Sequence, residues 1–334
     1  MNFRKIFSIV IIAVVLLGIT TACKSKSGQT ITISMVDNGY DSQKTHNALV
    51  ALVIKHAYSG YDTTSSLAST TMNYESMKNG DIDIAVEIWT ENFATYPTDI
   101  KNGDIINMGV IVEDSRQGIY IPRYVTEGDP GRGIAPMAPG LKRVEDLLKY
   151  PHIFPDDESP SMGRLYGAIP GWKADAILHK KYEYYGLDKR FNYMRLGSEA
   201  ALFASLMSAY NLGQAWVGYC YEPTWIAGKL QLLLLEDAPY EPNAFQDGKT
   251  AFSTQQLMSV CNRQFPSKAP DIYEFLKKFR TGRMLISEAL AYLDDTKATH
   301  EETAIWFVKR YNELIDEWLP AENAKKLREY LSQI

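Results

Sequence analysis

Cysteine and histidine are scarce in this sequence, which restricts the chemistry that the chain can support. The 334 residues include three cysteines and five histidines, with no CxxC or HExxH motif among them. We therefore expect no built-in metal site and no cofactor. Beyond Cys23 only Cys220 and Cys261 remain, which excludes a disulfide-rich scaffold. These two form either one bridge in an oxidising compartment or two small buried apolar side chains, and the sequence favours neither.

Basic residues are also fewer than acidic residues. The chain has 35 Lys and Arg against 40 Asp and Glu, a formal net charge of −5 and no basic stripe, which argues against a nucleic-acid partner. The long apolar run, from Phe7 to Ile19, follows Arg4 and Lys5 and is too short to cross a bilayer comfortably. We predict a signal peptide over residues 1–22. Its removal takes away two positive charges and changes the net charge from −5 to −7.

Small residues precede the first cysteine. Thr21 and Ala22 lead to Cys23 in a way that resembles the lipobox of bacterial lipoproteins, with Thr20 where that motif usually has Leu. The resemblance implies that the Cys23 thiol carries a lipid. We predict an extracytoplasmic protein anchored to the cell membrane, with residues 23–30 as a polar tether. Cleavage and release without a lipid is the alternative.

Strand-like and helix-like patterns alternate through the rest of the chain. Apolar side chains recur at every second position in residues 81–89, and residues 71–79 read as a short helix that Gly80 ends. The order of elements predicts an α/β fold with a parallel sheet and helical crossovers. The predicted strands are 31–36, 81–89, 118–122, 214–220 and 232–235. The predicted helices are 45–58, 71–79, 144–148, 174–185, 199–210, 272–279, 286–293, 301–319 and 324–331.

The length beyond the signal peptide is too great for one average domain and suits two lobes, each with its own core. A Gly- and Pro-rich segment, residues 128–140, is a candidate linker or hinge. We predict a first lobe built from residues 31–124 and 252–334 and a second from residues 125–251. We expect a monomer.

Four aromatic residues lie where a ligand site is expected. Tyr40 and Tyr221 follow predicted strands, Trp89 closes the strand 81–89, and Trp172 lies in the turn that opens a predicted helix. Ligands of open parallel sheets bind outside the carboxyl ends of the strands, so these rings should meet. A quaternary ammonium has no hydrogen to donate and is best held by aromatic faces, each contributing about 0.5 to 2 kcal/mol. The four rings predict a cup for a small cation.

The helix that opens at Trp172 offers a place for an anion. The backbone N–H groups of Lys173 and Ala174 are among the unpaired donors of its first turn, and such donors suit a carboxylate. A zwitterion such as a betaine would satisfy the rings and these donors at once.

Each aromatic residue also has a structural alternative, because the chain holds 21 tyrosines and most tyrosines simply pack. For Tyr40 and Tyr221, packing and ligand contact fit the position equally well. Residues interpreted as structural are Trp216, Trp225 and Trp306 as packing residues, Glu87 as a solvated or hinge carboxylate, and Ser198 as a helix cap.

Six groups of short segments occur in a specific order and spacing. They are Asn79-Gly80-Asp81-Ile82-Asp83, Glu87-Ile88-Trp89, Pro170-Gly171-Trp172, Tyr184-Tyr185-Gly186-Leu187 with Phe191-Asn192-Tyr193, Gly197-Ser198-Glu199-Ala200-Ala201, and Tyr221-Glu222-Pro223-Thr224-Trp225. Together they resemble the substrate-binding proteins of glycine betaine, choline and proline betaine ABC importers, over nearly the whole mature chain.

The resemblance implies a hinged, two-lobed α/β fold of the type II periplasmic-binding-protein kind. Such a protein closes on its solute and presents it to an ABC permease in the cytoplasmic membrane. Trp89 and Trp172 fall on family positions that supply cage tryptophans, and Tyr221 falls where a third aromatic completes the cage. Lys173 replaces a frequently small residue and Phe93 replaces a histidine of one branch, so a different carboxylate anchor or a different quaternary amine stays open.

We therefore predict the substrate-binding component of an importer for glycine betaine or a related quaternary ammonium solute. Choline, carnitine or another amine is the alternative ligand, and a sensory solute-binding lipoprotein is the alternative role. An enzyme of the same fold would need a nucleophile with a base, or a pair of carboxylates, in the cleft. The sequence offers no such pattern, so we expect no catalytic activity.

Overall fold

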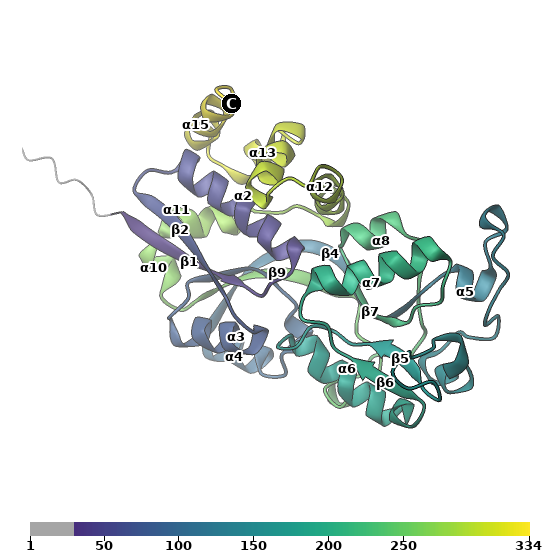
Figure 1. Cartoon of the computed structure of the whole chain (residues 1–334). Coiled ribbons are helices and arrows are strands. Elements are labelled where there is room, and N and C mark those ends of the chain that lie inside the picture. Colours follow the sequence, from purple (N-terminus) through teal and green to yellow (C-terminus); the bar gives the residue numbers. More distant parts are fainter. Residues whose placement is uncertain (1–29) are drawn as a thin grey trace, which may run out of the picture.

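A computed structural model describes residues 30–334 as an α/β protein with nine strands (Figure 1). The strand order is β2-β1-β3-β9-β4-β7-β5-β6, and β8 pairs with β4 outside this path. The predicted signal peptide, Cys23 and the tether as far as residue 29 lie outside the described residues. Among the residues described, no helix is both long and apolar enough to cross a membrane.

The first lobe contains one end of the chain's sheet. Strands β1 and β2 are parallel, β1 and β3 are parallel, and β9 runs antiparallel to both β3 and β4. Its strands are β1 (Ile31–Asp37), β2 (Tyr61–Leu67), β3 (Ile84–Ile88), β9 (Gln255–Asn262) and the first part of β4 (Ile105–Pro122). Its helices are α2 (Asp41–Ala57), α3 (Thr70–Asn79), α4 (Tyr96–Asn102), α10 (Phe265–Lys268), α11 (Pro270–Leu276), α12 (Arg283–Thr296), α13 (His300–Arg310), α14 (Leu314–Trp318) and α15 (Ala321–Leu331).

The second lobe is built around the other end of β4. That end pairs antiparallel with β7 and β8, while β5 pairs parallel with β6 and β7. Its strands are β5 (Gly163–Tyr166), β6 (Phe191–Met194), β7 (Gly218–Glu222) and β8 (Leu232–Leu234). Its helices are α5 (Tyr124–Glu127), α6 (Lys173–Tyr184), α7 (Glu199–Leu212), α8 (Trp225–Lys229) and α9 (Pro242–Phe245).

Strand β4 joins the two lobes. It pairs with β9 from Ile105 to Ser115 and with β7 from Arg116 to Tyr120. The chain returns to the first lobe just before β9. We propose that the lobes divide inside β4, because the predicted boundary after residue 124 would assign the part of β4 that pairs with β7 and β8 to the first lobe.

Segment 128–140 does not carry the chain from one lobe to the other. It folds back on α5, where the Ala138 N–H donates to the Val125 carbonyl at 2.8 Å. The interpretation of this segment as a hinge was wrong, because its glycines and prolines form a closed loop within the second lobe. Its short bridge joins Asp129 to Ile134.

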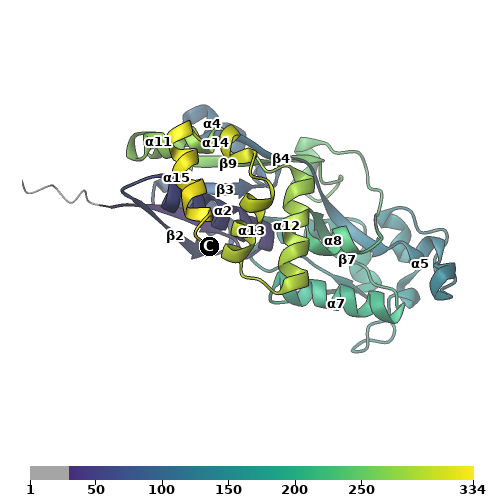
Figure 2. The ribbon, with the colours of Figure 1, turned by 90° about the horizontal axis from the view of Figure 1, so that it is seen from above.

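Helix α12 lies along the junction of the lobes, beside α8 of the second lobe (Figure 2). There the Lys229 ammonium lies 2.5 Å from carboxylate oxygens of both Asp294 and Asp295. The two lobes therefore meet on the α12 side of the molecule through an ion-pair cluster as well as through β4.

The helix predictions are confirmed in position, and two of them differ in form. Residues 301–319 contain two helices, α13 and α14, and residues 144–148 form a 3₁₀ helix, Val144–Lys149. The predicted parallel sheet was only partly right, because β9 and β4 make it mixed. The unpredicted strands are β2, β5, β6, β9 and the first part of β4.

The structure also bears on the predictions for one turn glycine, one buried tryptophan and two cysteines. Gly80 has φ 87° and ends α3, as expected for a residue in the left-handed region. Trp318 is fully buried, as its helical spacing predicted. Cys220 and Cys261 are free and buried, so the apolar alternative for these two residues is confirmed.

Candidate functional site: an aromatic cleft between the lobes

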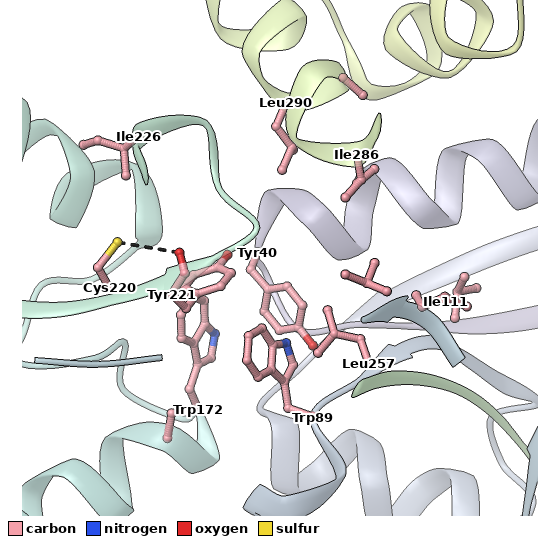
Figure 3. Packing of buried hydrophobic residues seen from close by; sticks show 14 of the residues in the cluster. Tyr40, Trp89, Ile111, Trp172, Cys220, Tyr221, Ile226, Leu257, Ile286 and Leu290 are labelled. Carbon is pink, nitrogen blue, oxygen red and sulfur yellow. Dashed lines mark hydrogen bonds between the residues drawn. The ribbon is translucent and has the colours of Figure 1, made fainter. Parts of the chain in front are cut away.

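The four aromatic residues singled out in the sequence come together where the lobes meet (Figure 3). Tyr40 caps the start of α2, Trp89 follows β3, and Trp172 caps the start of α6. Tyr221 lies within β7, opposite Gln117 of β4, and not after the strand as predicted. All four are buried, with exposed fractions between 2% and 8%.

The rings stand nearly at right angles to one another. The Tyr40 and Trp172 centroids are 5.3 Å apart at 87°, those of Trp89 and Tyr221 are 5.6 Å apart at 88°, and those of Trp172 and Tyr221 are 5.9 Å apart at 80°. Perpendicular rings at such separations can serve as adjacent walls of a box, with their faces turned to a shared space. An onium head group is attracted to ring faces of this kind.

Tyr219 is a fifth ring that the sequence analysis missed. Its centroid lies 6.3 Å from that of Trp172 and 6.1 Å from that of Tyr221. Tyr219 and Tyr221 are two positions apart on β7 and therefore point to the same face of the strand. That alternation was the available signal, but the predicted strand ended at residue 220 and hid it.

The space between the rings is small. Its volume is about 40 Å³. Its walls are mainly apolar and aromatic, with Asn38, Asn73, Asn92 and Thr70 among the polar exceptions. A compact head group fits such a cavity, whereas a peptide or a nucleotide does not.

Hydrogen bonds at the ring edges hold the rings in place. The Trp172 Nε1–H donates to the Asn38 carbonyl at 2.8 Å, and the Tyr221 hydroxyl donates to Glu199 at 2.6 Å. Burial raises the pKa of Tyr221 well above its usual value, and so does the Glu199 carboxyl. Burial, and then Glu87, likewise raises the pKa of Tyr40. These phenols stay protonated, and their faces remain available to a cation.

Glu87 is fully buried, and its interpretation as a solvated carboxylate was wrong. One carboxylate oxygen accepts from Ser42 Oγ at 3.0 Å and from Trp89 Nε1–H at 3.2 Å. The other lies 2.7 Å from His46 Nδ1. The reason is that α2 covers the face of β3 that the sequence left to solvent, so every residue of this strand is buried. Ser42 and His46, one turn apart on α2, were the signal for a buried partner.

The first turn of α6 is only partly available to an anion. The Lys173 N–H donates to Thr70 Oγ1 at 2.7 Å, so it is not the free donor that was predicted. Ala174 and the half-buried Lys173 side chain line the cavity. The Thr70 N–H in turn donates to the Gly171 carbonyl at 3.0 Å. This turn therefore joins the lobes directly.

Gly171 is required by that close approach. Its φ is 91°, in the region that favours glycine, and a Cβ there would lie 3.1 Å from the Ser69 Cβ of the other lobe. Any side chain at this position would strain the turn and press against the first lobe.

The residues interpreted as structural lie outside the cavity walls, except Glu87. Trp216 stacks on Tyr166 with centroids 5.5 Å apart, and Trp306 stacks on Tyr292 at 4.4 Å. Trp225 packs edge-on against Phe203. The predicted cap is confirmed, because Ser198 Oγ accepts from the Ala201 N–H at 3.2 Å. Phe93 does line the cavity, stacked on Tyr74 at 4.3 Å.

No group of three or more His, Cys, Asp or Glu side chains within residues 30–334 is placed to hold a metal ion. The cavity instead combines aromatic faces with one buried carboxylate at its wall. Such a lining suits a ligand that is apolar on its surface and positively charged within.

A two-lobed α/β fold with a small ligand cavity at the junction of its lobes defines a solute-binding protein. The chain belongs to the family described as the substrate binding domain of the ABC-type glycine betaine transport system, whose model matches residues 29–310. It is 24% identical over 294 residues to the trimethylamine N-oxide-binding protein of Pelagibacter ubique (strain HTCC1062), covering 82% of this chain and 90% of that protein.

Solved structures share the fold at low sequence identity. The glycine betaine/L-proline-binding protein of Borrelia burgdorferi gives a TM-score of 0.69 at 17% identity, covering 89% of this chain and 99% of that one. A choline binding protein in complex with choline gives a TM-score of 0.71 at 15% identity, covering 90% of this chain and 98% of that one. The lactococcal protein in its closed-liganded conformation with glycine betaine gives 0.67 at 17%, covering 87% and 100%.

These similarities confirm three predictions: the family, the two-lobed α/β fold class, and the role of substrate-binding component in an ABC transport system.

Proposed function

We propose that this protein binds a small trimethylated onium solute, such as glycine betaine, between its lobes and delivers it to an ABC permease. The observation that carries the proposal is the set of buried rings, nearly perpendicular to one another, around a small cavity at the lobe junction. Trp89, Trp172, Tyr40 and Tyr221 form this cage, with Tyr219 as a fifth wall. Each face that meets the cation contributes about 0.5 to 2 kcal/mol.

The buried carboxylate supports a cationic ligand. Glu87 lines the cavity, and its negative charge acts on the neighbouring ring of Tyr40. An onium head group in the cage would be attracted by the ring faces and by this charge together. We propose that the site binds its solute without chemical change, since the cavity wall is aromatic and the Glu87 carboxylate is engaged by three neighbouring donors.

The remainder of the ligand would face the polar side of the cavity. Thr70, Asn73, Asn92 and the side chain of Lys173 line that side, and they suit an oxygen-bearing group. Glycine betaine would place its carboxylate there. Choline, carnitine and trimethylamine N-oxide carry the same head group with other oxygen groups, and the first and last are named for relatives of this chain.

Calorimetric titration with glycine betaine, proline betaine, choline, carnitine and trimethylamine N-oxide tests the function. We expect saturable binding of at least one of them and none of the matching amines without methyl groups, because only the methylated head groups lack hydrogens to donate. Preference for glycine betaine over choline would place the Lys173 side of the cavity in contact with a carboxylate. Absence of binding by all five would contradict the proposal.

We also propose that the protein works outside the cytoplasm and is held to the membrane by a lipid on Cys23. The support is the lipobox-like sequence before Cys23 and the polar tether after it. The variant Cys23→Ser should move the protein from the membrane fraction to the soluble fraction of cells. A variant that is processed and yet stays with the membrane would show that another anchor exists.

A further inference from the structure

Glu199 touches the cage and the opposite lobe at the same time. It is the first residue of α7 in the second lobe and is almost fully buried. One carboxyl oxygen accepts from the Tyr221 hydroxyl at 2.6 Å, which is a contact with a cage ring. The other accepts from the Asp41 N–H at 2.8 Å, which is a contact with the first lobe.

The Asp41 N–H is a donor that needs such a partner. Asp41 is the first residue of α2, a helix of 17 residues, and the first N–H groups of a helix have no acceptor within it. The partial positive charge of the helix N-terminus also attracts a carboxyl group. Tyr40, the residue before Asp41, makes no side-chain cap, so Glu199 from the other lobe supplies the acceptor.

We propose that Glu199 is a positioning residue that couples the cage to closure of the lobes. When the lobes close, its carboxyl group reaches the start of α2 next to Tyr40, and the same group fixes the ring of Tyr221 against the ligand. This proposal rests on the proposed function, since it concerns how the onium cage is assembled. It differs from the direct contacts of the cage because Glu199 acts on the ligand only through Tyr221 and through the lobe contact.

The surroundings make this contact sensitive to pH. Burial first, and then the Asp41 carboxylate, raises the pKa of Glu199 to about 8, although the hydrogen bonds from Tyr221 and the Asp41 N–H and the charge of Lys44 oppose the rise. The other titratable groups nearby are His300 of α13, 3.6 Å from an Asp41 carboxylate oxygen, Tyr219 and Cys220 of β7, and Glu87, whose charge acts on Tyr221. Burial lowers the pKa of His300, which disfavours the charged form of that neighbour.

The direction of the pH dependence follows from the pKa of Glu199 in the open and closed states of the protein. With the lobes apart, the Glu199 carboxyl meets water, and its pKa should return toward the ordinary 4.5. The closed state therefore binds a proton that the open state has lost between about pH 4.5 and pH 8. Closure is favoured at the acid end of this window and weakens as pH rises through it, by at most about tenfold per pH unit. Above about pH 8 the dependence levels off.

The test compares the parent with Glu199→Gln and with the matched control Ser198→Ala. The glutamine keeps the shape but can accept from only one of the two donors, and it cannot lose a proton. Ser198 is exposed and caps the same helix without touching Tyr221. Glycine betaine binding is measured by calorimetry between about pH 5.5 and pH 9, and the radius of gyration of the ligand-free protein is measured by small-angle scattering over the same range.

We expect Glu199→Gln to bind roughly tenfold more weakly than the parent near pH 6, through the loss of one buried hydrogen bond, and to show a flat pH profile. Ser198→Ala should keep the parent's profile. The radius of gyration of the ligand-free parent should increase as pH rises, whereas that of Glu199→Gln should not change with pH. Tyr221→Phe, which removes one of the two bonds and keeps the ring, should weaken binding in the same direction.

The outcomes separate this proposal from the proposed function. A parent that binds no onium contradicts the function, while the scattering arm still tests the contact between Glu199 and α2. A parent that binds glycine betaine, together with a Glu199→Gln variant of equal affinity and equal pH slope, overturns the role of Glu199 and leaves the cage intact. If Glu199→Gln does not fold, Tyr221→Phe is the deciding variant. An affinity of Tyr221→Phe equal to that of the parent would overturn the proposed coupling between the cage and lobe closure.

Discussion

Replacing Trp89 or Trp172 with alanine will weaken binding of the onium solute by about 1 to 3 kcal/mol, roughly 5- to 150-fold in Kd. Each substitution removes a ring face from a buried cavity, where the attraction between cation and ring is strongest. Trp172→Ala should show the larger loss, because it also removes the 2.8 Å hydrogen bond to the Asn38 carbonyl that joins the lobes. Calorimetry on the folded variants measures both.

Two matched variants make this prediction specific. Trp306→Ala removes the same side chain from the first lobe, where it stacks on Tyr292 away from the cavity, so it should leave affinity unchanged. Trp172→Phe keeps an aromatic face but not the indole N–H. Its affinity for the solute should lie between those of the parent and Trp172→Ala. Parent-like affinity in both alanine variants of the cage would remove these tryptophans from the site.

Replacing Glu87 with alanine will destabilise the protein by about 3 to 5 kcal/mol, because three buried groups lose their partner at about 1 to 3 kcal/mol each, and the first of them is the ring of His46, whose Nδ1 lies 2.7 Å from the carboxylate. The substitution also leaves the Ser42 hydroxyl and the Trp89 Nε1–H without their acceptor. Glu87→Gln should destabilise less, since its carbonyl still accepts one bond. It should also bind the cation more weakly than the parent, because the negative charge at the cavity wall is gone.

Urea unfolding measures the loss of unfolding free energy in Glu87→Ala, with Glu75→Ala as the control variant. Glu75 is an exposed residue of α3 whose ion pair with Lys78 is 3.6 Å long, and its removal should change the unfolding free energy by less than about 0.5 kcal/mol. Equal stability of the two variants would contradict the buried pair. Undiminished affinity in Glu87→Gln would show that the ring faces alone attract the cation.

Local pattern was sufficient to predict most helices and the strands that carry strong alternation. The unpredicted strands were hidden for identifiable reasons. Strand β2 is a polar strand, mostly exposed at the edge of the sheet, so it lacks an apolar face to recognise. Strand β9 enters the sheet antiparallel from far along the chain, and no local signal specifies such a partner. The division of β4 between two sets of partners is likewise a property of the whole fold.

The site was predictable to the extent that it depends on strand ends. Tyr40, Trp89 and Trp172 were found because each lies just after a strand or at the start of a helix. The roles of Glu87 and Glu199 were not, because they depend on contacts with α2 that bring together residues 41 to 158 positions apart. A carboxylate that looks solvated on its own strand is buried when a helix from elsewhere covers it.

The central claim is that the cage recognises a positive charge and not only a methylated surface. The most direct test is calorimetric comparison of glycine betaine and choline, each against its analogue in which a carbon atom replaces the nitrogen. The analogues keep the shape and the methyl groups and lose the cationic charge. We predict that whichever of the two solutes binds does so at least about tenfold more tightly than its carbon analogue, since the ring faces and Glu87 act on the charge. Equal binding of solute and analogue would contradict the account.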